Sequence, residues 1–293
     1  MRLLTRGSPL GLRNQLARIR PDLDVSTLVY EGRPQPPAYA QMRHYAGEAT
    51  AALSFAILAP MQIAQKLPIL LDDLTELAGD WQVLALLADI PEGSELMPSF
   101  RRSSFIVWAR QTVFQLNWER KRSGIEAWDW RPWLPTDLPA MQSLHHRLVP
   151  GQFQAIEAVT RKRLQGLVLK DHQGRLLAYA DLDQGPKGFW AQVFALPEMN
   201  DPLALNALGA ALAENFDLLG RPIFLACRSY QPWLQELAAQ CGMPAADERA
   251  LLVRFLSRYA RDLAQQEAAE ELAFGARVPV AQLSGEAKEP THT

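Results

Sequence analysis

The chain has 293 residues, 48% of them hydrophobic, and its 30 basic and 32 acidic residues give a formal net charge of -2. This length exceeds the usual span of one compact core, and the balanced charge provides no global field for nucleic acid or an anionic membrane. No stretch of about 18 uninterrupted apolar residues is present, and the basic opening lacks the apolar core of a signal peptide. We therefore expect a soluble, cytoplasmic protein of two domains that binds neither nucleic acid nor membrane.

The segment 50–116 carries strand, helix, strand, helix and strand signals in that order. Apolar runs at 50–60, 83–89 and 106–116 predict strands, and the middle one is typical of a strand buried on both faces. Between the first two runs, apolar residues recur at helical spacing, and Gly79 is expected to end the helix. The apolar face of this helix comprises Ile63, Leu67, Leu70, Leu71, Leu74, Leu77 and Ala78.

The segment 187–256 repeats the same order of signals. Its first helix should begin at Asp201, a favourable N-cap, followed by Pro202, whose missing N–H costs nothing at the first helical position. Gly220 is the expected end of that helix. Upstream, residues 165–196 predict three antiparallel strands joined by two short turns, so the second sheet should be mixed and flanked by helices.

The two segments indicate an internal duplication. Pro60 and Pro197 are 137 positions apart, and Phe105 and Met243 are 138 apart. The pattern breaks near Ser123, which predicts a domain boundary there. We expect a reduced N-terminal domain over 1–124, a C-terminal domain over 125–260, and a polar helix extension with a disordered tail over 261–293.

Two pairs of titratable residues are candidates for chemistry. His145 and His146 offer a base that titrates near neutral pH, or else form an exposed pair on a helix. Neighbouring helical residues point about 100° apart, so at most one of the two can face a site. Asp181 and Asp183 share one face of a strand and are either a base or metal pair, or solvated acids beside a turn. No HExxH, GxSxG, Walker-type or zinc-finger spacing is present, so we predict no metal site and assign no catalytic residue.

Other clusters also have two interpretations. Trp128, Trp130 and Trp133 either stack a ligand or fill the core. The basic run 120–122 is either a phosphate contact or a solvated linker. The two cysteines have no CxxC pairing, which favours packed, reduced thiols over a disulfide; they are Cys227 and Cys241.

The second half, from WRPWLPTDLPAMQSLHHRL through FALP to CRSYQPWLQELAAQCGMPAADERALLVRFL, resembles a GNAT-type acetyltransferase domain. The first half, which ends in SFRRSSFIVWARQTVFQL, resembles a reduced copy. The resemblance implies an α+β fold of two GNAT-like domains, each a bent, mixed, mostly antiparallel sheet with flanking helices. In that family two central strands splay apart and acyl-CoA lies in the gap, with its pyrophosphate on main-chain N–H groups of a glycine-containing loop at a helix N-terminus.

Both halves depart from the family's pattern. The corresponding loops, EMNDPLA and MQIAQKLP, contain no glycine, and Asp201 and Pro202 occupy or remove amides that a pyrophosphate needs. The tyrosine that often serves as general acid in the family is replaced by Ala238 in the second half and by Phe100 in the first. Acetyl-CoA or another acyl-CoA, implied by the resemblance alone, is therefore expected to bind weakly or not at all.

Two functions stay open. The first is an acyl-CoA-dependent N-acyltransferase that acts on a small-molecule or peptide amine. The second is a catalytically degenerate GNAT-fold protein that binds a small molecule or a protein partner in the retained cleft. The acyl group, the acceptor and the oligomeric state are not indicated by the sequence.

The gap between the splayed strands should persist even without catalysis, because its unpaired main-chain groups need a ligand or water. A poorer gap is expected in the first half between 55–59 and 86–89, where Phe100 helps to plug it. In the second half the guanidinium of Arg228 should favour an anionic group of a ligand. The residues expected to line that principal pocket and contact a cofactor are Val193, Phe194, Ala195, Arg228 and Tyr230.

Overall fold

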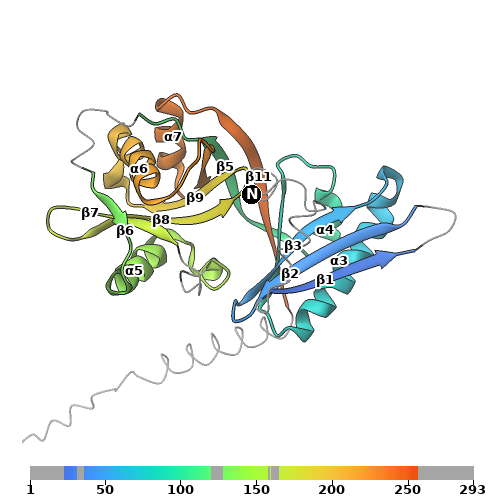
Figure 1. The fold of residues 1–293 in the computed structure, drawn as a ribbon. Coiled ribbons are helices and arrows are strands. Elements are labelled where there is room, and N and C mark those ends of the chain that lie inside the picture. Colours follow the sequence, from blue (N-terminus) through green and yellow to red (C-terminus); the bar gives the residue numbers. More distant parts are fainter. Residues whose placement is uncertain (1–22, 32–35, 120–127, 158, 160–164, 257–293) are drawn as a thin grey trace, which may run out of the picture. The chain divides into compact units, whose positions relative to one another are not determined.

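The computed structural model describes residues 23–31, 36–119, 128–157, 159 and 165–256. Within these ranges, one sheet has the strand order β1-β2-β3-β4-β11-β5-β10-β9-β8-β7-β6 (Figure 1). None of the helices in these ranges is long and apolar enough to cross a membrane. The strands are β1 (Leu23–Tyr30), β2 (Ala38–Tyr45), β3 (Thr50–Ile57), β4 (Ala85–Pro91), β5 (Ile106–Gln115), β6 (Trp130–Pro132), β7 (Gly166–Lys170), β8 (Leu176–Gly185), β9 (Gly188–Ala195), β10 (Ile223–Arg228) and β11 (Ala245–Phe255). The helices are α3 (Ile63–Asp80), α4 (Met97–Arg102), α5 (Leu138–Leu148), α6 (Pro202–Asn215) and α7 (Pro232–Gln240), with single 3-10 turns at Pro60–Gln62, Pro135–Asp137, Gly151–Phe153 and Pro197–Met199.

The sheet repeats one pattern in two halves, which we define as the described residues of 23–119 and of 128–256. β3 pairs with β4 in parallel, as β9 does with β10, and the remaining neighbours are antiparallel. This confirms the predicted common order of elements and the α+β class with a mixed sheet and flanking helices. The boundary expected after residue 124 and the tail expected over 261–293 lie outside the described residues, so the division into domains stays a prediction.

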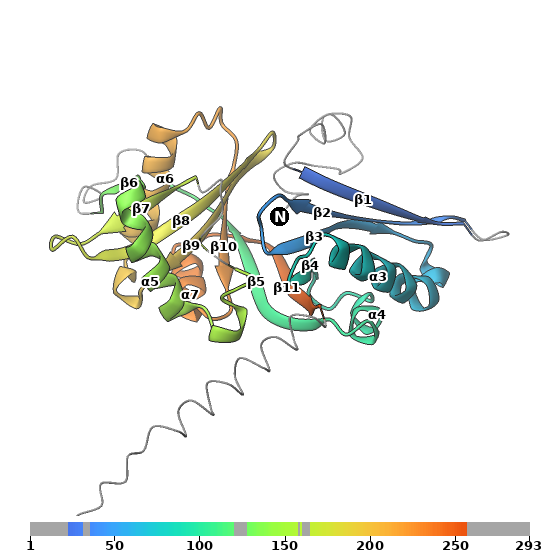
Figure 2. The same ribbon diagram turned by 90° about the horizontal axis from the view of Figure 1, so that it is seen from below.

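The closing strand of each half pairs with the other half. β5 lies between β11 and β10, while β11 lies between β4 and β5 (Figure 2). Gln111 of β5 and Arg249 of β11 are opposite each other in this central pair. The sequence predicts a sheet for each half; instead one sheet runs through both, because each closing strand covers an edge that the other half would otherwise leave unpaired.

Helix α3 contains a proline whose cost is offset by a neighbouring helix. Pro68 has no N–H for the carbonyl of Ala64, four residues earlier. Arg102 of α4 supplies the missing donor, with 2.7 Å between its Nη1 and that carbonyl oxygen. Both helices lie on the same face of β2 and β3 (Figure 2). The helix ends at Asp80, one residue beyond the expected stop at Gly79.

Helix α6 begins as predicted and ends earlier than predicted. The Asp201 carboxylate accepts a hydrogen bond from the N–H of Leu203 at 2.8 Å, which confirms the N-cap. The end expected at Gly220 is wrong, because the last helical residue is Asn215. The backbone of Phe216 is extended, with φ of -134°. The centroid of its ring lies 6.3 Å from that of Phe189.

Strand β9 is buried along its whole length because apolar layers cover both of its faces. Alternate side chains, Ala191, Val193 and Ala195, join a core that includes residues of α6 and α7. On the other face, Phe194 packs in a core with Met141 and Leu144 of α5. This double coverage explains the uninterrupted apolar sequence of the strand.

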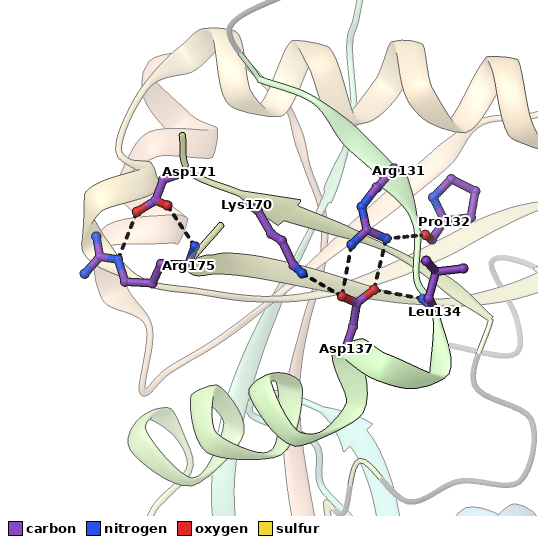
Figure 3. Close-up of polar contacts among 7 residues, drawn as sticks. All are labelled: Arg131, Pro132, Leu134, Asp137, Lys170, Asp171 and Arg175. Atoms are coloured by element: carbon purple, nitrogen blue, oxygen red, sulfur yellow. Dashed lines mark hydrogen bonds and ion pairs between the residues drawn. The ribbon is translucent and has the colours of Figure 1, made fainter. Parts of the chain in front are cut away.

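A buried carboxylate anchors the start of α5 to the sheet (Figure 3). Asp137 is only 1% exposed and accepts hydrogen bonds from both Nη atoms of Arg131, at 2.9 and 3.0 Å. Lys170 of β7 lies 2.8 Å away, and the N–H of Leu134 donates at 2.8 Å. Three positively polarised groups thus surround one carboxylate, and the hydrogen bonds from Arg131 hold its pKa well below the usual range.

Candidate functional site

Strands β9 and β10 separate as predicted. They pair from Phe189 opposite Ile223 to Gln192 opposite Ala226, and the pairing stops there although both strands continue. The Gln192 side chain spans this point, with its Nε2 3.3 Å from the Ala226 carbonyl. The expected splay in the second half is therefore present.

The gap beyond this point is filled by Gln231, the residue just before α7. Its side chain is fully buried. The amide oxygen accepts from the N–H of Ala195 at 2.9 Å, and the amide nitrogen donates to the carbonyl of Val193 at 3.0 Å. The expectation that a ligand or water satisfies these main-chain groups is therefore corrected, because a side chain of the protein satisfies both.

Arg228 and Tyr230 bind an internal carboxylate. Nε and Nη2 of Arg228 lie 2.9 and 2.7 Å from Oε1 of Glu157, and the Tyr230 hydroxyl donates to Oε2 at 2.6 Å. The side chains of Arg228 and Glu157 are 13% and 5% exposed. The guanidinium also lies over the ring of Trp108, 5.5 Å from its centroid. Arg228 does hold an anionic group, and that group comes from the segment after α5.

Burial controls the protonation of this cluster. Burial first, and then the charge of Glu157, raise the pKa of Tyr230. Burial, the largest single effect, would lower the pKa of Arg228, but the charge and hydrogen bonds of Glu157 together with the electrostatic contributions of Tyr230 and Asp89 outweigh it, and the pKa is raised. Tyr230 is therefore a neutral hydrogen-bond donor and Arg228 a permanent cation. Both groups are bound to Glu157, so neither is placed to transfer a proton to a ligand.

Of the two helix N-termini that would hold a pyrophosphate, the one in the second half is capped. There the Asp201 carboxylate accepts a hydrogen bond from the N–H of Leu203. In the first half the side chain of Gln62 accepts from the N–H of Ala59 at 3.1 Å and donates to the carbonyl of Pro36 at 2.7 Å, and no side chain caps α3 itself. An incoming phosphate would have to displace the Asp201 contact in the second half.

The positions of the family's tyrosine lie in the core. Ala238 is fully buried, and Phe100 is 1% exposed. The ring of Phe100 packs edge-on against Phe105, with 5.1 Å between the centroids. Neither position supplies a hydroxyl group, so the structure assigns no catalytic acid there.

The two histidines of α5 point in different directions. His145 is buried, with its ring 5.4 Å from that of Phe194, whereas His146 is exposed. The alternative in which both histidines are exposed is therefore wrong, because His145 is buried. Asp181 and Asp183 are half-buried on β8, and in the described ranges no three potential metal ligands gather into a site.

The tryptophans and cysteines have structural roles. Trp130 is 4% exposed and donates from Nε1 to the carbonyl of Ala204 at 3.0 Å, and Trp128 and Trp133 pack against the cores. This confirms the core alternative over ligand stacking. Cys227 and Cys241 form no disulfide, and burial raises the pKa of Cys227. The basic run 120–122 lies outside the described residues.

The first half has a gap of a different kind. β3 pairs with β4 at only three positions, the last being Ala52 opposite Leu87. A register shift against β2 marks a bulge next to Ser54, whose Oγ is buried and has no hydrogen-bond partner in the described ranges. Whereas all of β9 is buried, β3 is partly exposed from Ala52 onward and Ile57 is exposed. The strand with the more exposed residues is therefore in the half where the sequence predicts the poorer gap.

Sequence reasoning missed Glu157 and Gln231, the two residues that occupy the predicted site. Glu157 lies in an irregular segment without periodicity, 71 positions from its partner Arg228. Gln231 precedes Pro232 and was recognisable only as part of a helix start. The only signal for Gln231 in the sequence is its place, as a polar residue between an apolar strand and a proline that starts a helix.

Removing the Gln231 amide should destabilise the second half. In Gln231→Ala the N–H of Ala195 and the carbonyl of Val193 lose their partners inside the core. We expect the free energy of unfolding, measured by urea denaturation, to fall by about 2 to 3 kcal/mol. Gln240→Ala, an exposed change on the same helix, should cost less than about 0.5 kcal/mol. Equal losses in both variants would contradict a bridging role for Gln231.

No protein-family model matches the chain, and no curated protein matches it. Among solved structures, it is similar to a GCN5-related N-acetyltransferase from Sphaerobacter thermophilus, at 13% identity, over 74% of this chain and 76% of that chain, with a TM-score of 0.47. It is also similar to a tandem GNAT protein from the clavulanic acid biosynthesis pathway, solved without AcCoA, at 12% identity, over 80% and 84%, with a TM-score of 0.46. A third is a GCN5-related N-acetyltransferase from Kribbella flavida, at 11% identity, over 80% and 92%, with a TM-score of 0.47. All three are described as GNAT-type proteins, and at these identities they transfer no activity, substrate or cofactor to this chain.

Proposed function

We propose that this chain is a catalytically degenerate GNAT-fold binding protein, built from two GNAT-like halves, whose second half no longer accepts acyl-CoA. The observation that carries the proposal is the Gln231 side chain, which bonds the free edge of β9 at Val193 and Ala195. A cofactor in this gap would have to displace a fully buried amide and leave its two polar ends without partners.

Two further features support the loss of cofactor binding. In the second half the helix N-terminus beside the gap is capped by Asp201. Arg228, at the end of β10, is already neutralised by Glu157. Neither of these two groups is thus left to hold a pyrophosphate at low cost.

Arg221, a basic side chain that could replace a phosphate loop, is also committed to contacts within the protein. The Arg221 guanidinium donates to three carbonyls, those of Gly185, Asp217 and Leu218, at 2.6 to 3.0 Å. It also lies over the ring of Phe189, 4.7 Å from the centroid. Lys187 is exposed in the turn between β8 and β9. Arg221 therefore organises the loop after α6 and has few donors left for a ligand.

Titration of the full chain with acetyl-CoA tests the proposal. Calorimetry should show no dissociation constant tighter than about 1 mM, which corresponds to about -4 kcal/mol. Incubation with acetyl-CoA and a mixture of small amines should release no CoA thiol above the buffer rate. A control enzyme with known acetyl-CoA binding verifies the cofactor. A low-micromolar dissociation constant, roughly -8 kcal/mol, or measurable turnover would replace the proposal by the acyltransferase alternative.

A further inference from the structure

We propose that the outer edge of β1 is a docking surface for a second copy of this chain, and that the two β1 strands pair antiparallel across a two-fold axis. In the sheet order β1 has one neighbour, β2, so within the described ranges its other edge is unpaired. The inference is independent of the proposed function, because two strands, β2 and β3, separate this edge from the nearer gap.

The two ends of the sheet differ in how they are protected from pairing. β6, at one end, has only three residues and includes Pro132, which has no N–H to donate. β1, at the other end, has eight residues in continuous register with β2, and its sequence contains neither proline nor lysine. Short strands, prolines, lysines and bulges are the features that keep edge strands from pairing with another chain. The edge of β1 has none of these features and is therefore open to pairing.

The main chain of β1 supplies the first set of contacts. Alternate residues of a strand direct both their N–H and their C=O groups to the same edge, so about half of the residues of β1 present these groups on the side away from β2. Two copies would thus exchange about eight main-chain hydrogen bonds. A dimer of this kind has closed two-fold symmetry, and it uses up the only long free edge of the described sheet. The association is therefore expected to stop at two copies.

The sequence of β1 favours one register of this pairing. When identical strands pair antiparallel about a two-fold axis, one residue lies opposite its own copy. With Thr27 on the axis, Val25 lies opposite Val29 of the second copy, and Asp24 lies opposite Tyr30 of the second copy. Threonine pairs and pairs of β-branched residues that lie directly opposite each other stabilise antiparallel strands. Thr27 is exposed and Val29 is 50% exposed, so these pairs would also remove apolar surface from water.

The same register brings opposite charges together. Lys66 of α3 lies over the ring of Tyr30, with its Nζ 3.9 Å from the ring centroid. Asp24 is exposed and lies on the same face of the sheet as Tyr30, because the two residues are an even number of positions apart in one strand. Opposite Tyr30 of the second copy, the Asp24 carboxylate would therefore lie beside the Lys66 ammonium of that copy. Two symmetric ion pairs result, and they select a second copy of this chain as the occupant of the edge.

Sedimentation equilibrium of the full chain measures the association. We expect a monomer–dimer equilibrium with a dissociation constant of about 10 to 100 µM, because a single pair of strands is a small interface. Hydrogen exchange of the unmodified chain gives a second readout: protection of alternate β1 amides should rise with protein concentration, whereas that of β6 should stay unchanged. A chain that stays monomeric up to about 1 mM, or exchange in β1 that does not depend on concentration, would overturn the inference.

Two charge reversals test the register. Asp24→Lys and Lys66→Glu each replace the two attractive pairs of the dimer by two repulsive ones, so each variant alone should dimerise about 10-fold more weakly than the unmodified chain. An equimolar mixture of the two variants should regain the original affinity to within about 3-fold, because each mixed dimer contains two pairs of opposite charge. This recovery requires that the two positions meet between copies and not within one chain.

Glu214→Lys and Lys187→Glu are the matched controls. They make the same changes in net charge at exposed positions of α6 and of the turn between β8 and β9, and they should dimerise like the unmodified chain. Equal weakening in the controls would assign the effect to net charge, and a mixture as weak as the single variants would show that Asp24 and Lys66 do not meet. Either result would overturn the inference. If a variant fails to fold, the concentration dependence of exchange in β1 of the unmodified chain still decides it.

Discussion

Replacing Glu157 by Ala should lower the free energy of unfolding by about 3 to 5 kcal/mol, the cost of breaking a buried ion pair by removing one partner. Glu157 is 5% exposed and accepts three hydrogen bonds, two from Arg228 and one from Tyr230. Without the carboxylate, a guanidinium whose side chain is 13% exposed would stay in the core without a counter-ion. Urea denaturation at neutral pH measures the loss.

A matched control uses an ion pair of similar length at the surface. Arg110 and Glu92 approach to 3.1 Å, with side chains 64% and 36% exposed. Glu92→Ala should cost less than about 1 kcal/mol, because water and counter-ions replace the partner. Similar losses for Glu157→Ala and Glu92→Ala would show that the buried cluster does not hold the segment after α5 on β10.

Two further variants separate charge from hydrogen bonding in this cluster. Tyr230→Phe removes one donor to the carboxylate and should cost about 1.5 to 3 kcal/mol. The double change of Glu157→Leu with Arg228→Met removes both charges and keeps the volume, so it should cost less than Glu157→Ala alone. A double variant less stable than Glu157→Ala would indicate that the cluster is retained for its packing.

Local patterns predicted the elements that depend on local physics. The Asp201 cap and the buried strands around Val193 and Leu225 follow from sequence because a cap and an apolar run involve neighbours in the chain. The end of α6 was misplaced because Gly220 resembles a C-terminal stop. The helix ends at Asn215, where Phe216 turns to pack against Phe189.

The exchange of closing strands could not be predicted from these patterns. The sequences of β5 and β11 predict strands, but the partner of a strand is set by contacts far away in the chain. β5 pairs with β10, more than 100 positions later, through registers such as Val113 opposite Ala226. Apolar composition is the same for a strand that pairs within its half or across halves.

The residues of the candidate site could also be predicted only in part from the sequence. The sequence singled out Arg228 and Tyr230 as residues that line one pocket, with Arg228 favouring an anionic group, and the structure places both on one carboxylate. The anion was missed because Glu157 belongs to a short irregular segment, where no period assigns a side chain to a face. Gln231 was missed for a related reason, since capping rules concern its backbone position and leave the direction of its side chain undetermined.

Replacing Asp137 by Ala should be comparably destabilising, by about 3 to 5 kcal/mol, because Arg131 and Lys170 both lose their counter-ion and Leu134 loses its acceptor (Figure 3). The two cations are each 33% exposed and can partly rehydrate, which favours the lower end of that range. Asp171→Asn is the neighbouring control, since Asp171 pairs with a half-exposed Arg175 and its loss should matter much less.

The stability that Asp137 contributes should also depend on pH with a definite sign. Its pKa in the folded protein is lowered from 3.8, first by the hydrogen bonds from Arg131, so the folded state favours the charged carboxylate more than the unfolded state does. The contribution is therefore complete above the unfolded pKa and is lost as the pH falls below about 3.8 towards the folded value. Urea denaturation of the unmodified chain and of Asp137→Asn should give a stability difference that is constant from pH 7 to about pH 5 and shrinks in more acidic solution. A difference that grows on acidification would mean that the carboxylate is protonated more readily in the folded protein, and that Arg131 and Lys170 do not stabilise its charge.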